Sequence, residues 1–170
     1  LVAKNFFYEE SVRVPLLMRP ARGAGGGGRA CDALVSNGLD LLPTLCDVAG
    51  IDAPSGLTGR SLKPMLEGRT PRDWRDELVL EVSPEMGSGR MVHTGRWKYA
   101  SYQSGGCREE LYDLQTDPGE LHNLAGDPAH SDLLAEGRRR LSEWRRATSD
   151  PEPNVGPDPQ AVGTPRSKPR

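Results

Sequence analysis

Apolar and polar positions recur with different periods in different parts of the chain, and these periods predict its elements. Residues 12–18 form a short, continuous apolar run with β-branched members, which predicts a buried strand. Between residues 39 and 49 the apolar side chains recur at helical spacing, which predicts a helix that ends at Gly50. A second, short helix is predicted over residues 61–67.

Each of these two predicted helices contains a proline. We place Pro43 and Pro64 in the first helical turn, where the missing backbone N–H would have had no helical partner. Ser36 or Asp40 is then expected to cap the longer helix, and Gly68 to end the shorter one.

From residue 77 the period changes to two, which is typical of half-buried strands. The alternation covers four successive segments, residues 77–82, 90–94, 96–102 and 110–114. Gly95 separates the second segment from the third and predicts a tight hairpin. Pro118 and Gly119 predict a turn after the fourth segment, in which proline fixes one φ angle and glycine supplies another. Four such segments in succession predict an antiparallel meander.

Residues 131–146 form the clearest predicted helix, with Ser131 as its N-cap. Its apolar face consists of Leu133, Leu134, Leu141 and Trp144. The opposite face carries a run of arginines, and Glu136 stands four residues before Arg140, a favourable helical ion pair. Because the net charge of the chain is only −2, we interpret this run as a solvated face rather than a site for an anionic partner. The helix is expected to lie across one face of the sheet.

Composition excludes several classes of protein. The net charge of −2 argues against general nucleic-acid binding, and no apolar run approaches the roughly 18 residues of a membrane helix. Because the chain opens with Leu1 rather than Met, we expect it to be a piece of a longer protein. Residues 148–170 are rich in proline and contain few large apolar groups, which predicts a disordered tail.

Three cysteines, Cys31, Cys46 and Cys107, lie far apart in the sequence. Without a Cys-x-x-Cys pair or cysteines and histidines at zinc spacing, they argue against a structural zinc site. Cys46 lies in an apolar helical run, where a cysteine acts as a small buried hydrophobe. The pairing of Cys31 with Cys107 is open at this point, and so is the redox compartment.

Five phrases occur together in one order: Lys-Asn-Phe-Phe-Tyr-Glu-Glu-Ser-Val-Arg-Val-Pro-Leu-Leu at 4–17, Leu-Asp-Leu-Leu-Pro-Thr-Leu-Cys-Asp-Val-Ala-Gly-Ile at 39–51, Gly-Arg-Ser-Leu-Lys-Pro-Met-Leu-Glu-Gly at 59–68, Arg-Met-Val-His-Thr-Gly-Arg-Trp-Lys-Tyr at 90–99 and Glu-Leu-Tyr-Asp-Leu-Gln-Thr-Asp-Pro-Gly-Glu-Leu-His-Asn-Leu-Ala at 110–125. In this order and spacing, residues 1–147 resemble the C-terminal part of sulfatases in the alkaline phosphatase superfamily. They are most similar to arylsulfatases and to the C-terminal region of N-sulphoglucosamine sulphohydrolase.

The resemblance implies a truncated α/β fold of the alkaline-phosphatase type. Residues 1–75 would be the end of a large α/β domain. Residues 76–147 would form a small four-stranded antiparallel sheet with a packed C-terminal helix, followed by the disordered tail at 148–170.

The resemblance also implies chemistry that this chain does not carry. Family members use a formylglycine made from Cys or Ser in a Cys/Ser-x-Pro/Ala-x-Arg motif, together with a divalent metal, usually calcium. None of the three cysteines is followed by Pro and Arg at those offsets. We therefore expect no metal ligands and no cofactor in this chain, and no activity of the chain alone.

Two residues are predicted to meet substrate. By the resemblance, Lys4 holds the place of a lysine that contacts the sulfate, where a fixed ammonium stabilises charge that grows in the transition state. Without the motif, Lys4 would be an ordinary exposed lysine. His93 is a candidate for substrate contact, or else a hairpin residue with no direct role. For the carboxylates Asp40 and Asp47, a cap or an exposed charge is favoured over paired catalysis.

The function implied is the hydrolysis of sulfate esters or sulfamates, with a small-molecule or saccharide sulfate as substrate. Two alternatives are open: a phosphodiester or phosphonate monoester hydrolase, because one scaffold can host several chemistries, and a non-catalytic interaction module. Neither a nucleic-acid partner nor a membrane span is expected. The sequence does not indicate the cellular location.

Overall fold

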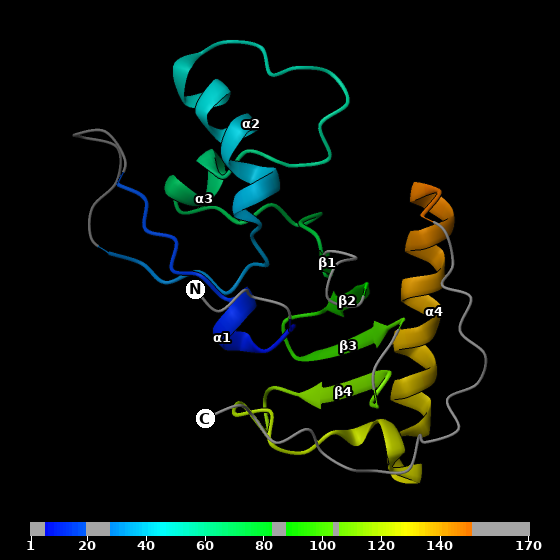
Figure 1. The fold of residues 1–170 in the computed structure, drawn as a ribbon. Helices are drawn as coiled ribbons and strands as arrows, with labels where there is room; N and C mark the ends of the chain where they lie inside the picture. The colour runs from blue at the N-terminus through cyan, green and yellow to red at the C-terminus, as the bar shows by residue number, and fades with distance from the viewer. Residues whose placement is uncertain (1–5, 20–27, 83–87, 104–105, 151–170) are drawn as a thin grey trace, which may run out of the picture. The chain divides into compact units, whose positions relative to one another are not determined.

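Figure 1 shows the computed structural model of the chain, which describes residues 6–19, 28–82, 88–103 and 106–150. The chain divides into two compact units: residues 14–76 form one, and residues 1–13 together with 77–170 form the other. Lys4 and most of the predicted tail lie outside the described residues. Within the described residues, no helix is both long and apolar enough to cross a membrane.

The predicted meander is confirmed. Its strands are β1 (Leu78–Val82), β2 (Gly89–His93), β3 (Trp97–Tyr102) and β4 (Glu109–Asp113), joined in the order β1-β2-β3-β4 with every neighbouring pair antiparallel. Thr94 donates its backbone N–H to the Trp97 carbonyl at 3.0 Å, and Gly95 takes a φ of 85°. The hairpin at Gly95 therefore forms as predicted, because glycine reaches positive φ without a steric penalty.

One face of this sheet is covered by the long helix α4 (Ser131–Thr148) (Figure 1). Its buried centre consists of Val92, Tyr99, Leu111 and Leu141, with the partly buried Leu133, Leu134 and Trp144 around it. Helix and strand pack tightly at Gly137, where an added Cβ would lie 2.6 Å from the Cβ of Tyr99. The apolar face predicted for the helix is thus the face that packs on the sheet.

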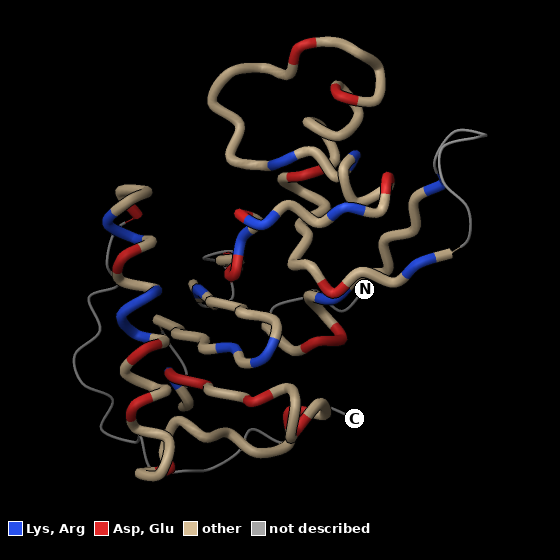
Figure 2. Tube along the Cα trace, turned by 180° about the vertical axis from the view of Figure 1, so that it is seen from behind, with Lys and Arg blue, Asp and Glu red and all other residues tan. Residues whose placement is uncertain are grey.

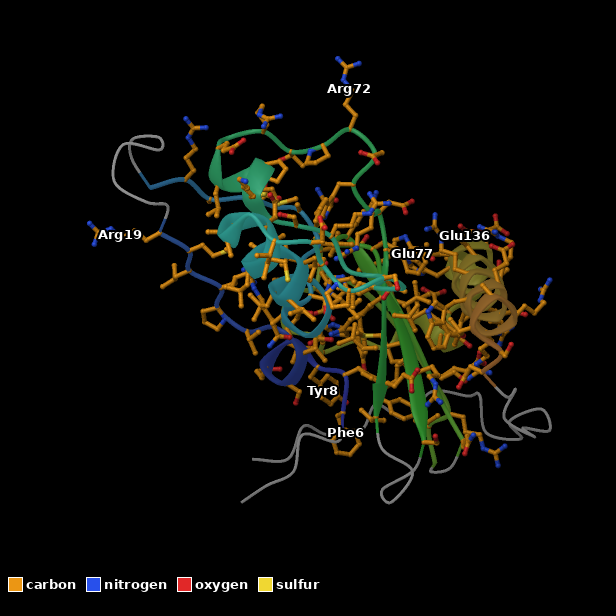
Figure 3. All side chains as sticks on the ribbon, turned by 90° about the horizontal axis from the view of Figure 1, so that it is seen from above. Phe6, Tyr8, Arg19, Arg72, Glu77 and Glu136 are labelled. Atoms are coloured by element: carbon orange, nitrogen blue, oxygen red, sulfur yellow. The ribbon has the colours of Figure 1, made fainter. Side chains whose placement is uncertain are left out.

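The arginines of α4 are paired within the unit. Figure 2 shows acidic and basic residues following one another along this helix. Arg140 donates to Glu77 and to Glu136, each at 2.7 Å, and Figure 3 shows these two carboxylates near each other beside the helix. Arg139 bridges Glu136 and Glu143. The predicted Glu136–Arg140 pair is confirmed, and the arginine run forms a salt-bridged surface.

The opposite face of the sheet is covered by the N-terminal segment, which contains the short helix α1 (Glu9–Val12). Phe7 is 2% exposed and packs with Met91, Ala100 and Tyr102. Its ring centroid lies 5.5 Å from that of Tyr102. Both faces of the sheet are therefore buried, so the inner strands carry apolar residues on both sides.

The prediction of a strand over residues 12–18 is wrong. Val12 ends α1, and residues 13–19 have no regular structure, with Leu17 94% exposed. A buried strand requires neighbouring strands that satisfy its backbone groups and layers that cover its faces. None of the four described strands pairs with these residues. The apolar run thus has the composition of a strand without the partners that would make it one.

The unit of residues 14–76 contains α2 (Asn37–Ala49) and α3 (Lys63–Leu66). Both helices were predicted, and Pro64 lies in the first turn of α3 as expected. Pro43 does not, because α2 begins at Asn37 and places this proline in its interior. A proline at this position has no N–H to donate to the Leu39 carbonyl. The backbone of Gly59 packs against the same carbonyl, so closely that a Cβ added to Gly59 would lie 1.8 Å from the carbonyl oxygen.

The predicted helix caps are only partly right. Ser36 occupies the N-cap position of α2 without a side-chain bond, and Asp40 instead accepts the Ser36 backbone N–H at 2.8 Å. Gly50 ends α2 with a φ of 70°. Ser131 is the first residue of α4 rather than its cap, because the preceding 3-10 turn leads directly into the helix and is itself capped by Asp127.

We predict that Gly137→Ala lowers the free energy of unfolding by roughly 1 kcal/mol or more. The new methyl group would overlap Tyr99, and this overpacking outweighs the gain in helix propensity. Gly38→Ala is the matched control, because Gly38 is also helical and has no atom closer than 3.9 Å to an added Cβ. This control should be neutral or stabilising. Urea unfolding followed by circular dichroism measures both, and equal stability of the two variants would contradict the packing described for α4.

Candidate functional site

The structure brings His93 together with three charged side chains that the sequence analysis did not single out. We call Glu9, His93, Lys98 and Glu120 the Lys98 cluster. They come from α1, β2, β3 and the turn that follows β4. The cluster lies where the N-terminal segment meets the sheet, a few residues after Lys4, which itself lies outside the described residues.

Lys98 is the centre of the cluster and is 2% exposed. Its Nζ lies 2.5 Å from Oε1 of Glu120 and donates to the backbone carbonyl of Phe7, also at 2.5 Å. A third contact of 3.2 Å reaches Oε1 of Glu9. The contacts with Phe7 and Glu9 are hydrogen bonds, whereas the contact with Glu120 is an ion pair in which Oε1 accepts no hydrogen bond. A buried lysine is thereby partnered by one carbonyl and two carboxylates.

Glu120 is held on both of its carboxylate oxygens, although its side chain is only 1% exposed. While Oε1 faces Lys98, Oε2 accepts the backbone N–H of Glu9 at 2.6 Å. The predicted turn forms, with the Glu120 N–H bonded to the Asp117 carbonyl, but the positive φ falls on Glu120, at 54°, rather than on Gly119. A non-glycine residue in this conformation is uncommon, and it persists where surrounding bonds determine it.

His93 and Glu9 form the outer side of the cluster. Nδ1 of His93 accepts the backbone N–H of Gly95 at 2.9 Å, which leaves Nε2 to carry the ring proton, 3.2 Å from Oε1 of Glu9. The hydrogen bond from His93 and the charge of Lys98 lower the pKa of Glu9 to about 2, although burial opposes the shift. Both ring nitrogens of His93 thus have partners within the chain, and substrate contact by His93 stays a prediction.

Aromatic side chains surround the cluster on the same face of the sheet. The Tyr102 hydroxyl donates to Oε2 of Glu110 at 3.2 Å, and the rings of Tyr8 and Tyr112 lie 6.2 Å apart. Burial, and then the negative charge of Glu110, raise the pKa of Tyr102 and of Tyr112 far above the usual value. These phenols therefore remain protonated and act as hydrogen-bond donors rather than as bases.

The two carboxylates of α2 have structural partners, as expected. Asp40 is completely buried. Both of its carboxylate oxygens accept hydrogen bonds from the Arg75 guanidinium, and Oδ1 also accepts the backbone N–H of Arg60 at 2.9 Å. Its pKa is lowered by these bonds even though burial opposes the shift. Asp47 pairs with Lys63 at 2.9 Å and accepts the Ser61 hydroxyl at 2.6 Å. Neither carboxylate faces another as in a catalytic acid–base pair.

The described residues do not fit a metal ion. Among them, no group of three or more His, Cys, Asp or Glu side chains is placed to hold one. Calcium takes six to eight oxygen ligands, whereas the carboxylates of Glu9 and Glu120 face an ammonium and a backbone N–H. The three cysteines are free, and Cys46 is buried as predicted.

One sequence signal could have identified Lys98. It shares one face of β3 with Ala100 and Tyr102, and its neighbours Trp97 and Tyr99 lie on the other face. Because both faces of such a strand are apolar, a lysine within it must be buried and must find an anion. Its partner Glu120 has no comparable signal, since it lies in a turn whose composition is that of an exposed loop.

The chain matches a known family over most of its length. The family described as N-sulphoglucosamine sulphohydrolase, C-terminal, matches residues 1–147. The Δ4,5-hexuronate-2-O-sulfatase of Bacteroides thetaiotaomicron is 39% identical over 164 residues, which cover 88% of this chain and 32% of the relative. The chain spans between about a quarter and a third of the length of the curated relatives that it matches.

Solved structures show the same fold. A 2-O GAG sulfatase superposes with a TM-score of 0.66 and 42% identity, covering 72% of this chain and 27% of that protein. A phosphonate monoester hydrolase from Silicibacter pomeroyi superposes with a TM-score of 0.55 and 30% identity, covering 64% of this chain and 24% of that protein. The expected truncated fold of the alkaline-phosphatase type, with its four-stranded antiparallel sheet and C-terminal helix, is thereby confirmed.

We predict that Glu9→Gln makes the stability of the chain less sensitive to acid. The pKa of Glu9 is about 2 in the folded chain and near 4.5 ordinarily, so its contribution to the free energy of unfolding is complete above pH 5 and is lost as the pH falls toward 2. Urea unfolding at pH 7 and pH 3 measures the difference. Glu143→Gln, at an exposed ion pair of α4, is the control. If Glu9→Gln and the parent chain lost equal stability on acidification, the charge assigned to Glu9 would be wrong.

Proposed function

The chain belongs to the family of N-sulphoglucosamine sulphohydrolase C-terminal regions, within the alkaline phosphatase superfamily, and from this premise we propose that it forms the C-terminal region of an active sulfatase. The reaction would be the hydrolysis of a sulfate ester or a sulfamate. The observation that carries this proposal is the family match over residues 1–147, together with 39% identity to a sulfatase.

Within that reaction, Lys4 is the residue of this chain proposed to touch the substrate. Sulfuryl transfer places negative charge on the leaving oxygen and on the oxygens around sulfur. A fixed ammonium group stabilises that charge more in the transition state than in the ground state, which raises the rate of the chemical step. The Lys98 cluster supports this role because it fastens Phe7 and Glu9, only a few residues after Lys4.

The nucleophile and the metal are not assigned to this chain. Its cysteines lack the Pro and Arg of the formylglycine motif, and its described residues do not fit a metal ion. A divalent metal would supply charge neutralisation at the sulfate, but no residue described here would hold it. We therefore propose that the 170-residue chain alone has no sulfatase turnover.

The substrate class proposed is a saccharide sulfate. The relative at 39% identity is a sulfatase for the 2-O position of a Δ4,5-hexuronate, and the solved structure at 42% identity is a 2-O GAG sulfatase. A second candidate is a phosphonate monoester or phosphodiester hydrolase. It is favoured by the superposition on a phosphonate monoester hydrolase at 30% identity, because the two chemistries share one scaffold.

The proposal is tested with a chimera in which this chain replaces the matching C-terminal region of the Bacteroides hexuronate sulfatase. We predict that the chimera hydrolyses a hexuronate 2-O-sulfate, and that Lys4→Ala lowers its kcat by at least about 100-fold, the loss typical of one electrostatic contact to a transition state. Sulfate release measures both. The 170-residue chain alone should release none.

Lys63→Ala is the matched control, because Lys63 is a half-exposed lysine paired with Asp47 and no role in substrate binding is assigned to it. This variant should keep the kcat of the parent chimera. A chimera that folds but hydrolyses only a phosphonate monoester would favour the second candidate. Full sulfatase activity of the Lys4→Ala chimera would refute the role given to Lys4.

A further inference from the structure

We propose that one side of α2 is an interface for the part of a sulfatase that lies outside the C-terminal region matched here. The side chains that form it are Leu41, Leu42, Leu45 and Val48, and we call them the α2 apolar face. The partner that fits this face is an apolar sheet surface of the α/β domain. The proposed interface depends on the family of the chain and not on the reaction proposed above.

The α2 apolar face is uncovered in the described part of the chain. All four of its side chains are exposed, with Leu45 at 64% and Val48 at 59%. Apart from Leu121, every exposed large apolar side chain of the described residues belongs to the unit of residues 14–76. The two apolar core clusters of the described residues both lie in the other unit. The unit that contains α2 therefore presents its large apolar side chains outward.

The polar side of α2 is the side that is bound within its own unit. Asp40 and Thr44 are both buried. Asp40 accepts hydrogen bonds from Arg75, and the Thr44 hydroxyl oxygen accepts the backbone N–H of Leu62 at 2.8 Å. An amphipathic helix normally turns its apolar side toward a core and its polar side toward water. In α2 the polar groups are bound inside and the leucines face outward, so this helix has a second partner on its apolar side.

A lipid surface does not fit α2. A helix that lies in a membrane interface carries lysines and arginines on its polar side, whereas α2 contains neither. Its polar side is also occupied by the bonds of Asp40 and Thr44 and cannot face lipid headgroups. Contiguous exposed apolar side chains that are not membrane-bound mark protein interfaces.

The comparison with solved structures points to which protein surface covers this face. The 2-O GAG sulfatase superposes on 72% of this chain, but the match covers only 27% of that protein, so most of a relative lies outside the matched part. In an α/β fold, a helix with one apolar side is stable when it lies on a sheet.

A second segment of the same unit lacks a sheet as well. Residues 14–18 have the apolar composition of a strand but no regular structure, and Leu17 is almost fully exposed. A strand of this composition needs neighbouring strands and covering layers. One sheet in the remainder of a sulfatase would provide both the strands for this segment and the apolar surface for α2.

Thiol labelling tests whether the α2 apolar face becomes covered. Leu45→Cys is introduced into the 170-residue chain and into the chimera with the Bacteroides hexuronate sulfatase, and mass spectrometry locates the label. The new thiol should react readily in the 170-residue chain and at least about 100-fold more slowly in the chimera, where labelling requires local opening. Arg72→Cys is the control and should react at the same rate in both proteins, because Arg72 is exposed in the same unit and points away from it (Figure 3).

Urea unfolding gives a second measurement. Leu41→Gln/Leu45→Gln should leave the unfolding equilibrium of the 170-residue chain unchanged, because both leucines are exposed and glutamine has a similar helix propensity. In the chimera, the same substitutions should raise the equilibrium constant for unfolding by at least about 100-fold, because two leucines lose their burial. Leu121→Gln, at an exposed leucine of the other unit, is the matched control and should change neither protein.

The results that would overturn the interface are distinct. Equal labelling of Leu45→Cys in the two proteins would show that the chimera leaves the face open. Slow labelling in the 170-residue chain would show that the face is already covered, by a second copy if dilution speeds the reaction and by the chain itself if it does not. A parent chimera that does not fold would show that this face does not fit the sulfatase domain. If Leu45→Cys unfolds the chimera but not the 170-residue chain, the interface is supported.

The outcomes also separate the interface from the proposed function. A folded chimera with a covered α2 apolar face but no turnover would overturn the proposed function alone. An active chimera in which the Leu45→Cys thiol stays as reactive as in the 170-residue chain would overturn the interface alone.

Discussion

The N-terminal segment is joined to the sheet through one buried ion pair, between Lys98 and Glu120, whose side chains are 2% and 1% exposed. Removing one partner of such a pair leaves the other charge buried without its counter-ion and costs about 3–5 kcal/mol. Here the remaining bonds go to the backbone of Phe7 and Glu9. Because the two buried charges bind this backbone, they join the first described residues of the chain to a sheet that begins some seventy residues later.

This constraint gives the sheet two different faces. The face toward α4 is held by apolar packing around Leu141, with arginine–carboxylate pairs at its edge. The face toward the N-terminal segment combines apolar packing around Phe7 with the Lys98 cluster. The first face needs only shape complementarity, whereas the second places a specific backbone segment. The backbone of that segment is bound at Phe7 and Glu9.

The parts of the fold that were predictable from the sequence have strong local periodicity. The meander and the helix that ends at Thr148 were predicted because alternation and helical spacing persist over whole elements. The strand expected at residues 12–18 does not form. Its apolar composition can be recognised in the local sequence, whereas the neighbouring strands that it would need cannot. Pro43 was misplaced because the start of α2 was set too late. The Lys98 cluster could not be predicted as a set, since its members join through tertiary contacts, and Glu120 adopts a conformation that the turn sequence assigned to glycine.

The coupling energy between Lys98 and Glu120 tests this account most directly. It is obtained from the free energies of unfolding of the parent chain, Lys98→Met, Glu120→Gln and the double variant. The single substitutions should each be strongly destabilising, and the double variant should be less destabilised than their sum by more than about 1 kcal/mol. Effects that add within about 0.5 kcal/mol would show that the two charges contribute independently, and would contradict the claim that their pairing joins the N-terminal segment to the sheet.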